Sequence, residues 1–203
     1  MLTPLKFFVF VAILTLPMTG NAAADSKAPR EIVTTFQTAL VETMQEALFL
    51  APDERYGKLA PAIDTAFHIE EGAALVSTPH WRKTDDPGRA EMAKAFRHLS
   101  VSTLATRFDG YDGQNFVIID EKDGPRETHI VRTEIVDPDQ TKRSVAYILK
   151  NVDDRWGIID IIVDGGISEL SIRRSEYKDI LRSDGISGMA KAMMAKGNDL
   201  LTQ

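Results

Sequence analysis

Apolar residues recur at three- and four-residue spacing from residue 32 onward, a pattern typical of an amphipathic helix. The apolar positions on one face of this predicted helix are Ile32, Val33, Phe36, Leu40, Met44, Ala47 and Leu48. Gln37 falls on the opposite face, together with several glutamates, and is expected to lie in water. The chain therefore opens, after a short polar lead-in, with a helix that packs one face on a core.

The pattern between residues 52 and 78 is interrupted and predicts several short helices. Pro52 and Pro61 suit the first turn of a helix, and Gly57 and Gly72 break the run. A longer helix is expected to follow, with Asp86 as its N-cap, and to end near Asp109.

From residue 115 the spacing changes from helical to alternating, which predicts strands. The four expected strands cover residues 115–120, 127–136, 143–150 and 155–163. Short turn-rich connections favour an antiparallel meander. Two helices, over residues 168–182 and 186–201, are expected to complete the chain. This order predicts an α+β fold with a twisted antiparallel sheet of four, or five, strands packed by N- and C-terminal helices.

Both faces of the central predicted strands are apolar. Val145, Tyr147 and Leu149 share one face, while Ala146 and Ile148 share the other. An antiparallel sheet with one face in water should alternate cleanly between apolar and polar residues. Two alternatives follow: the sheet is packed on both sides, or one face borders an apolar cavity.

The N-terminal residues resemble a cleaved secretion signal. Lys6 precedes an apolar stretch from Phe7 to Leu16, and the small triplet Ala22-Ala23-Ala24 follows. This apolar stretch of ten residues is too short for a membrane-spanning helix, which needs about 20. We expect cleavage after Ala24, which leaves residues 25–203 as one soluble domain outside the cytoplasm.

Composition narrows the classes of function. The chain has no cysteine, which excludes a lipid anchor at the cleavage point, disulfides and thiol chemistry. Loss of Lys6 with the signal lowers the formal net charge from −6 to −7, so a nucleic-acid partner is not expected. The four histidines have no metal-motif spacing, and hydrolase and nucleotide motifs are absent, so no metal or cofactor is expected.

Asp160 supports an alternative, enzymatic hypothesis. An acidic residue among apolar neighbours on a curved sheet, with Tyr147 on the adjoining strand, could abstract a proton from an apolar substrate in the manner of an isomerase. The competing interpretation is that Asp160 is exposed or bonded to a neighbouring strand.

Two groups near the C-terminus have both functional and structural interpretations. Arg173 and Arg174 could bind a lipid headgroup or dock a partner, or could simply be solvated. Met189, Met193 and Met194 could form an adaptable lid over a ligand, or fill gaps in a core.

Taken together, the strand and turn residues resemble the MlaC family of periplasmic lipid-shuttling proteins. The resemblance rests on residues 156–168, on Arg174-Ser175-Glu176-Tyr177, and on earlier matches such as residues 108–113. Residues Asp164-Gly165-Gly166-Ile167-Ser168 and the same Arg174–Tyr177 motif are more similar to the hopanoid-associated HpnM branch than to the phospholipid-carrying branch, which tends to have a Gly-Val-Ser turn.

This resemblance implies an NTF2-like general shape with an apolar cavity between the sheet and the helices. It also implies a non-catalytic carrier that moves phospholipid or hopanoid across the periplasm, served by an inner-membrane transporter complex and an outer-membrane or exporter partner. The expected lipid-binding residues are Phe36, Leu40, Phe96, Leu99, Leu104, Val117, Ile119, Val131, Ile135, Val145, Tyr147 and Leu149. The sequence leaves open which strand face lines the cavity.

Overall fold

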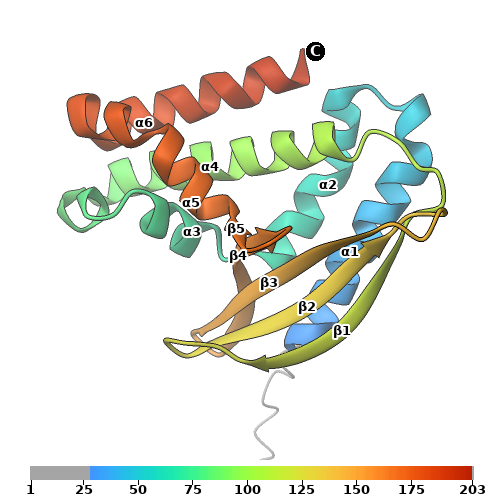
Figure 1. The fold of residues 1–203 in the computed structure, drawn as a ribbon. Helices are drawn as coiled ribbons and strands as arrows, with labels where there is room; N and C mark the ends of the chain where they lie inside the picture. The colour runs from blue at the N-terminus through green and yellow to red at the C-terminus, as the bar shows by residue number, and fades with distance from the viewer. Residues whose placement is uncertain (1–27, 203) are drawn as a thin grey trace, which may run out of the picture.

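A computed structural model describes residues 28–202, in which helices precede and follow a single sheet (Figure 1). The expected signal peptide, residues 1–24, lies outside the described residues. Before the sheet come α1 (Pro29–Glu46), η1 (Ala47–Phe49), α2 (Pro52–Ala66), α3 (Ile69–Val76), η2 (His80–Lys83) and α4 (Asp86–Arg107). The strands are β1 (Asn115–Asp123), β2 (Thr128–Val136), β3 (Lys142–Val152), β4 (Arg155–Val163) and β5 (Ile167–Ser168). After them follow α5 (Glu169–Glu176) and α6 (Lys178–Leu201).

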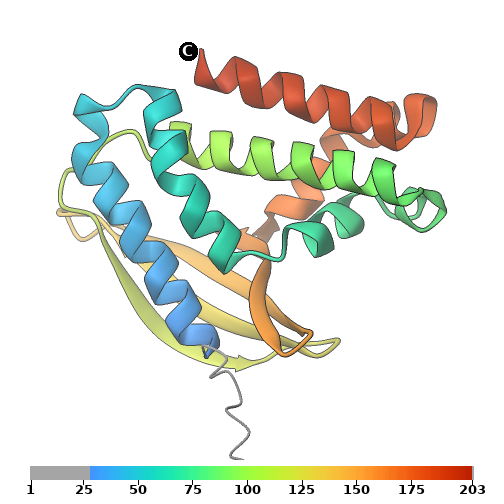
Figure 2. The same ribbon diagram turned by 180° about the vertical axis from the view of Figure 1, so that it is seen from behind.

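The sheet is an antiparallel meander in the order β1-β2-β3-β4-β5. The predicted α+β class is therefore confirmed, and β5 supplies the fifth strand. The sheet is strongly curved, and α1 crosses its concave face (Figure 2). A second layer, in which α4 and α6 pack along each other, lies beyond α1 and α2 (Figures 1 and 2).

The prediction of several short helices between residues 52 and 78 is wrong in its first part. A single helix, α2, runs through both Gly57 and Pro61. Pro61 has no N–H to donate to the carbonyl of Gly57. Because Gly57 is exposed, water can bond that carbonyl instead. A proline is thus tolerated where its missing hydrogen bond faces solvent.

The boundaries of two other helices differ from the prediction. The N-cap of α4 is Asp85, one residue earlier than expected, and its carboxylate accepts from the backbone N–H of Gly88 at 3.1 Å. The expected helix over residues 168–182 breaks at Tyr177, between α5 and α6. Within α6, Gly185 is non-helical, with a φ of 67°, so the break expected between residues 182 and 186 is present as a kink.

Two apolar clusters form the interior of the molecule. The first joins the concave face of the sheet to α1 and α2, around Phe36, Leu59 and Tyr147. The second joins α3, α4 and α6, around Phe96 and Met193. The Val145, Tyr147 and Leu149 face of β3 is the buried one, whereas Ala146 and Ile148 on the other face are only half-buried. The helices therefore cover one face of the sheet.

Two residues of the first helix lie on the side opposite to their prediction. Gln37 is buried, and its Nε2 donates to the hydroxyls of Thr133 at 3.2 Å and Tyr147 at 3.3 Å. Leu48 is 82% exposed, because the chain leaves α-helical geometry at Ala47 and forms η1. A polar side chain that finds hydrogen-bonding partners can lie in a core, and helical spacing does not reveal those partners.

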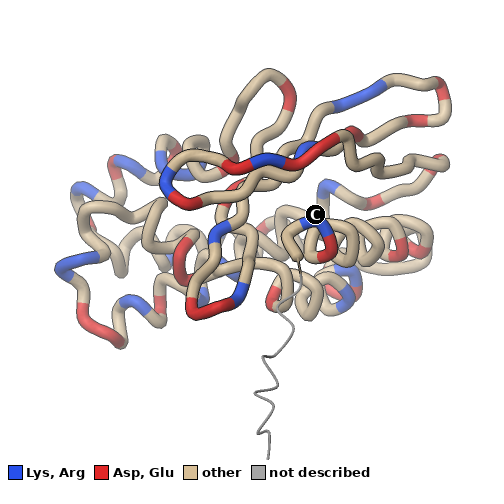
Figure 3. The backbone as a smooth tube through the Cα atoms, turned by 90° about the horizontal axis from the view of Figure 1, so that it is seen from below, with Lys and Arg blue, Asp and Glu red and all other residues tan. Residues whose placement is uncertain are grey.

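Positive and negative residues are interspersed along the backbone rather than separated (Figure 3). Several form ion pairs across the sheet: Lys142 of β3 pairs with Glu134 of β2, and Arg143 of β3 pairs with Asp137 in the turn between these strands. Among residues 28–202, no helix combines the length and the apolar character needed to cross a bilayer.

Candidate functional site

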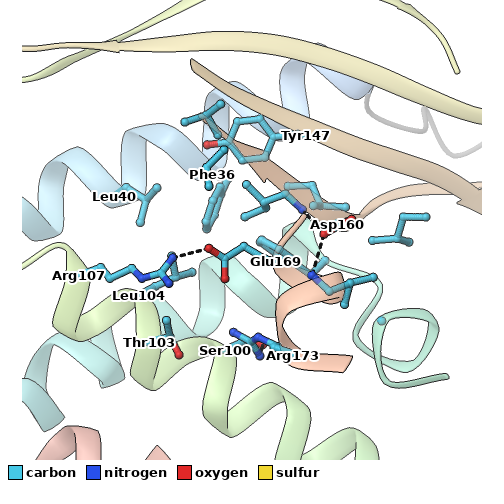
Figure 4. Close-up of a pocket in the computed structure, with 18 of the residues that line it drawn as sticks. Phe36, Leu40, Ser100, Thr103, Leu104, Arg107, Tyr147, Asp160, Glu169 and Arg173 are labelled. Carbon is cyan, nitrogen blue, oxygen red and sulfur yellow. Dashed lines mark hydrogen bonds and ion pairs between the residues drawn. The ribbon is translucent and has the colours of Figure 1, made fainter. Parts of the chain in front are cut away.

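A cavity of about 140 Å³ lies where the two apolar clusters meet (Figure 4). Residues of α1, α3, α4, α5 and of the strands β1 to β4 form its wall, together with the residues that connect α2 to α3. Most of the lining side chains are apolar. The elements that build the site are thus far apart in the sequence, and the fold brings them together.

The sheet side of the cavity is apolar and aromatic. Phe36 stands edge-on to Tyr147, with ring centroids 6.1 Å apart, and also to Phe67 at 5.1 Å. Leu40 lies one helical turn beyond Phe36 on α1 (Figure 4). Burial raises the pKa of the Tyr147 phenol, so this hydroxyl stays neutral at physiological pH. The part of the wall around Phe36 and Tyr147 therefore carries no charge.

The helix side carries the polar groups. Arg107 at the end of α4 forms an ion pair with Glu169 at the start of α5, with 2.6 Å between Nη1 and Oε1 (Figure 4). Farther along α5, Arg173 donates from Nη1 to the hydroxyl of Ser100 at 2.9 Å. The site is amphipathic, with an apolar wall opposite a polar one.

Asp160 borders the cavity but is engaged in structural hydrogen bonds. Its Oδ1 accepts from the backbone N–H groups of Ile161 at 2.8 Å and Leu170 at 3.1 Å. Its Oδ2 accepts from the hydroxyl of Ser168 at 2.6 Å. A carboxylate at the start of a helix also interacts favourably with the helix dipole. Of the two interpretations of Asp160, the geometry fits the one in which its carboxylate is bonded to a neighbouring strand, here through Ser168 of β5.

Seven of the residues expected to bind lipid lie on the cavity wall: Phe36, Leu40, Phe96, Leu104, Ile135, Val145 and Tyr147. Leu99, Val131 and Leu149 are buried in the two clusters but do not reach the wall. Their burial reflects packing of the cores around the cavity.

The expectation that Val117 and Ile119 line the cavity is wrong. They are 39% and 49% exposed, and the residues of β1 that pack on the core are Phe116 and Ile118. Side chains alternate along a strand, so the choice of face decides the position of every residue in it. A register shift between Ile118 and Asp120 further disturbs the pattern in this strand.

The two arginines of α5 differ sharply. Arg173 is buried on the cavity wall, whereas the adjacent Arg174 is exposed and does not reach the wall. Met189 and Met193 are fully buried in the second cluster, and none of the described methionines lines the cavity. Their placement corresponds to the core-filling interpretation.

Several wall residues were not anticipated from the sequence. They are Phe67, His68, Gly72, Ser100, Thr103, Arg107, Phe108, Phe116, Ile158, Ile159, Ile161, Val163, Glu169 and Leu170. The β4 residues carried a usable signal in their doubly apolar pattern. Arg107 and Glu169 carried none, because they come together only when the end of α4 meets the start of α5. Within residues 28–202, no cluster of His, Asp or Glu is suited to hold a metal ion.

Comparison with known proteins identifies relatives of this fold. The family model for MlaC protein matches residues 34–195. A solved structure of a phospholipid-binding protein from Ralstonia solanacearum, in complex with a phospholipid, is similar in fold, with a TM-score of 0.73 and 12% sequence identity. The match covers 86% of this chain and 99% of the other. Because the family model spans most of the sequence, the chain belongs to the MlaC family.

Proposed function

We propose that this protein is a lipid carrier that holds the acyl portion of a membrane lipid in the cavity between its two apolar clusters. The observation that carries the proposal is the cavity itself: a mostly apolar space with one polar wall, in a member of the MlaC family. The phospholipid bound to the Ralstonia solanacearum protein of similar fold supports the same class of ligand.

The physical argument is the cost of exposing acyl chains to water. Each methylene transferred from water is worth about 0.8 kcal/mol, so a chain of 16 carbons represents roughly 13 kcal/mol. A surface patch shields only part of a chain, whereas a cavity surrounds it. A void of about 140 Å³ is close to the volume of an engineered cavity that admits benzene. Lipid uptake therefore requires the cavity to enlarge.

The compartment and the route are part of the proposal. The expected signal peptide directs the chain to the periplasm, and the acidic mature chain would not adhere to anionic lipid surfaces. The carrier would then need protein docking sites: an inner-membrane lipid transporter complex on one side and an outer-membrane or exporter partner on the other. Shuttling between the two membranes follows from such an arrangement.

Phospholipid and hopanoid are both candidate cargoes. Residues 164–168 and 174–177 are more similar to the hopanoid-associated HpnM branch than to the phospholipid-carrying branch, which tends to have a Gly-Val-Ser turn. In the structure Gly165 and Gly166 have φ values of 77° and 100°, so this turn uses conformations that favour glycine.

The isomerase alternative has less support. A general base needs a lone pair directed at the substrate proton. Three of the roughly four lone-pair positions of a carboxylate are already used in Asp160, by hydrogen bonds from Ser168, Ile161 and Leu170. The carrier function does not use Asp160 as a base and is unaffected by this bonding.

Identification of the co-purifying molecule tests the proposal. Protein isolated from the periplasmic fraction should carry lipid, detected by native mass spectrometry and identified after organic extraction. Lipid-free protein should acquire the same lipid from vesicles. A preparation that is free of lipid and takes none up from phospholipid or hopanoid vesicles would contradict the carrier function.

A further inference from the structure

Arg173 is a buried cation with few partners. It is 9% exposed, and its guanidinium lies 5.2 Å from the centre of the Phe96 ring. A guanidinium has five N–H donors. Among residues 28–202, the hydroxyl of Ser100 is its hydrogen-bond acceptor, and no carboxylate lies within ion-pair distance. Burial lowers the pKa of Arg173 but leaves an arginine charged at neutral pH.

The neighbouring charges on the cavity wall are already compensated. Glu169 is paired with Arg107 at 2.6 Å. Asp160 accepts from the hydroxyl of Ser168 and from two backbone N–H groups. Arg173 is therefore the charged group of this wall whose charge is not matched by a direct partner. A buried charge without a partner is unfavourable, and a ligand that supplies an anion would remove that penalty.

The geometry points to a phosphate-binding role for Arg173: we propose that it holds the phosphate of a glycerophospholipid whose acyl chains occupy the apolar side of the cavity. The planar fork of a guanidinium matches the paired oxygens of a phosphodiester. This inference rests on the proposed carrier function and deepens it by naming an anionic headgroup.

The position of Arg173 fits this orientation of the lipid. Arg107 is 54% exposed, Glu169 is 17% exposed and Arg173 is the most buried of the three, so the polar wall leads from solvent into the cavity. Phe36 and Tyr147 stand on the opposite, apolar side (Figure 4). A phosphate at Arg173 would lie between solvent and the acyl chains. An uncharged hopanoid would leave Arg173 without its anion.

Substitution of Arg173 tests the proposal. Wild type and Arg173→Gln are titrated with phosphatidylglycerol and with the diacylglycerol of the same acyl chains, and binding is followed by native mass spectrometry. Loss of a charge-assisted hydrogen bond should weaken phosphatidylglycerol binding by about tenfold or more. Diacylglycerol binding should not weaken. Arg174→Gln is the matched control, because Arg174 is adjacent but exposed, and it should bind as wild type does.

Two measurements distinguish a loss of binding from a loss of folding. The thermal midpoint of ligand-free Arg173→Gln should equal or exceed that of wild type, since the variant removes a poorly paired buried charge. The rise in midpoint caused by phosphatidylglycerol should be lost. If Arg173→Gln does not fold, Arg173→Lys serves in its place: it keeps the charge without the fork and should bind phosphatidylglycerol less tightly than wild type.

Several results would overturn the proposal. Equal affinity of wild type and Arg173→Gln for phosphatidylglycerol would remove the headgroup role while leaving the carrier function intact. Failure to bind either lipid would reject both. Binding of glycerol phosphate as tightly as phosphatidylglycerol would assign the site to a soluble phosphate ester. Tighter binding of oleate would assign it to a fatty-acid carboxylate.

Discussion

Asp160 on β4 accepts hydrogen bonds from Ser168 and Leu170 at the start of α5, and a third from the N–H of Ile161 beside it. We therefore expect a structural role for Asp160 that can be separated from ligand binding. In Asp160→Asn, one acceptor becomes an N–H donor and the negative charge at the helix start is lost. The free energy of unfolding should fall by about 1 to 3 kcal/mol, measured by urea denaturation. Lipid uptake should be retained.

Asp164→Asn is the control for this prediction. Asp164 is exposed and accepts one bond, from the backbone N–H of Ser144 at 3.2 Å. Its substitution should change stability by about 0.5 kcal/mol or less. If Asp160→Asn were as stable as wild type but no longer took up lipid, Asp160 would belong to the ligand site.

Because His68 is buried and hydrogen-bonded, we expect the folded protein to lose stability in mild acid. The Nε2 of His68 donates to the carbonyl oxygen of Arg155 at 2.9 Å, and the Nδ1 of His68 accepts from Nη2 of Arg155 at 2.7 Å. Burial lowers the pKa of His68 from its ordinary value of 6.5. The unfolded chain therefore binds the proton more readily, so the contribution is complete above about pH 6.5 and is lost as the pH falls below it.

Urea denaturation between pH 7.5 and 5.5 measures this effect. Stability should decrease with acidification across that range in wild type. In His68→Gln the protein should be less stable at pH 7.5, because the pairing with Arg155 is weakened, and its stability should depend less on pH. Parallel curves for the two proteins would show that another group is responsible.

At the level of single residues, sequence predicted burial better than it predicted partners. The apolar positions Phe36, Leu40 and Tyr147 were anticipated because periodicity reports which face is buried. Periodicity did not determine the roles of Gln37 and Arg173, because their hydrogen-bonding partners are distant in the sequence. Gln37 bonds Tyr147, 110 residues away, and Arg173 bonds Ser100, 73 residues away. Polar burial depends on such distant partners.

At the level of elements, one segment is suited to move when the cavity enlarges. Residues 167–184 contain β5, α5 and the first part of α6, and they supply Glu169, Leu170 and Arg173 to the wall. Gly165 and Gly166 precede this segment and Gly185 follows it, all with positive φ. Backbone changes are most readily absorbed at such positions. We expect this segment to swing away from α4 on lipid uptake.

Distances between pairs of spin labels test this motion. Because the chain has no cysteine, labels attach only at the cysteines that are introduced. Lys94→Cys on α4 and Arg174→Cys on α5 are both exposed and should report a longer distance after lipid is added. The pair Lys94→Cys and Lys191→Cys serves as the control, because Lys191 lies beyond Gly185 on the part of α6 that packs along α4. An unchanged distance in the first pair would place the expansion elsewhere.

Strands were predicted more accurately than helices, and the reason is physical. Each strand was delimited by alternation and by strong turn residues, so four strands and their meander order were found. The interruption in α2 was misjudged, because Pro61 is tolerated where its missing bond faces water. The break expected between residues 182 and 186, by contrast, is found at the non-helical Gly185. Local composition does not show what faces solvent.

At the level of the whole molecule, the cavity lies at the junction of two cores and weakens their packing. An empty cavity costs about 24 cal/mol per Å³, so 140 Å³ corresponds to at most about 3 kcal/mol. A larger side chain that points into it should recover part of this free energy and exclude lipid. If the void is only a packing defect and does not hold lipid, the larger side chain should raise stability without reducing lipid uptake.

Val145→Phe on β3 is the variant that distinguishes these cases. Val145 is buried and lines the cavity, so a phenyl ring should extend into the void, hold or raise the urea midpoint and reduce lipid uptake by about tenfold or more. Ala146→Phe is the matched control, because the next residue along the strand points to the half-exposed outer face and should leave uptake unchanged. Equal uptake by both variants would mean that lipid does not enter at this junction. Loss of uptake in Val145→Phe alone would assign the void to the cargo, provided that this variant is at least as stable as wild type.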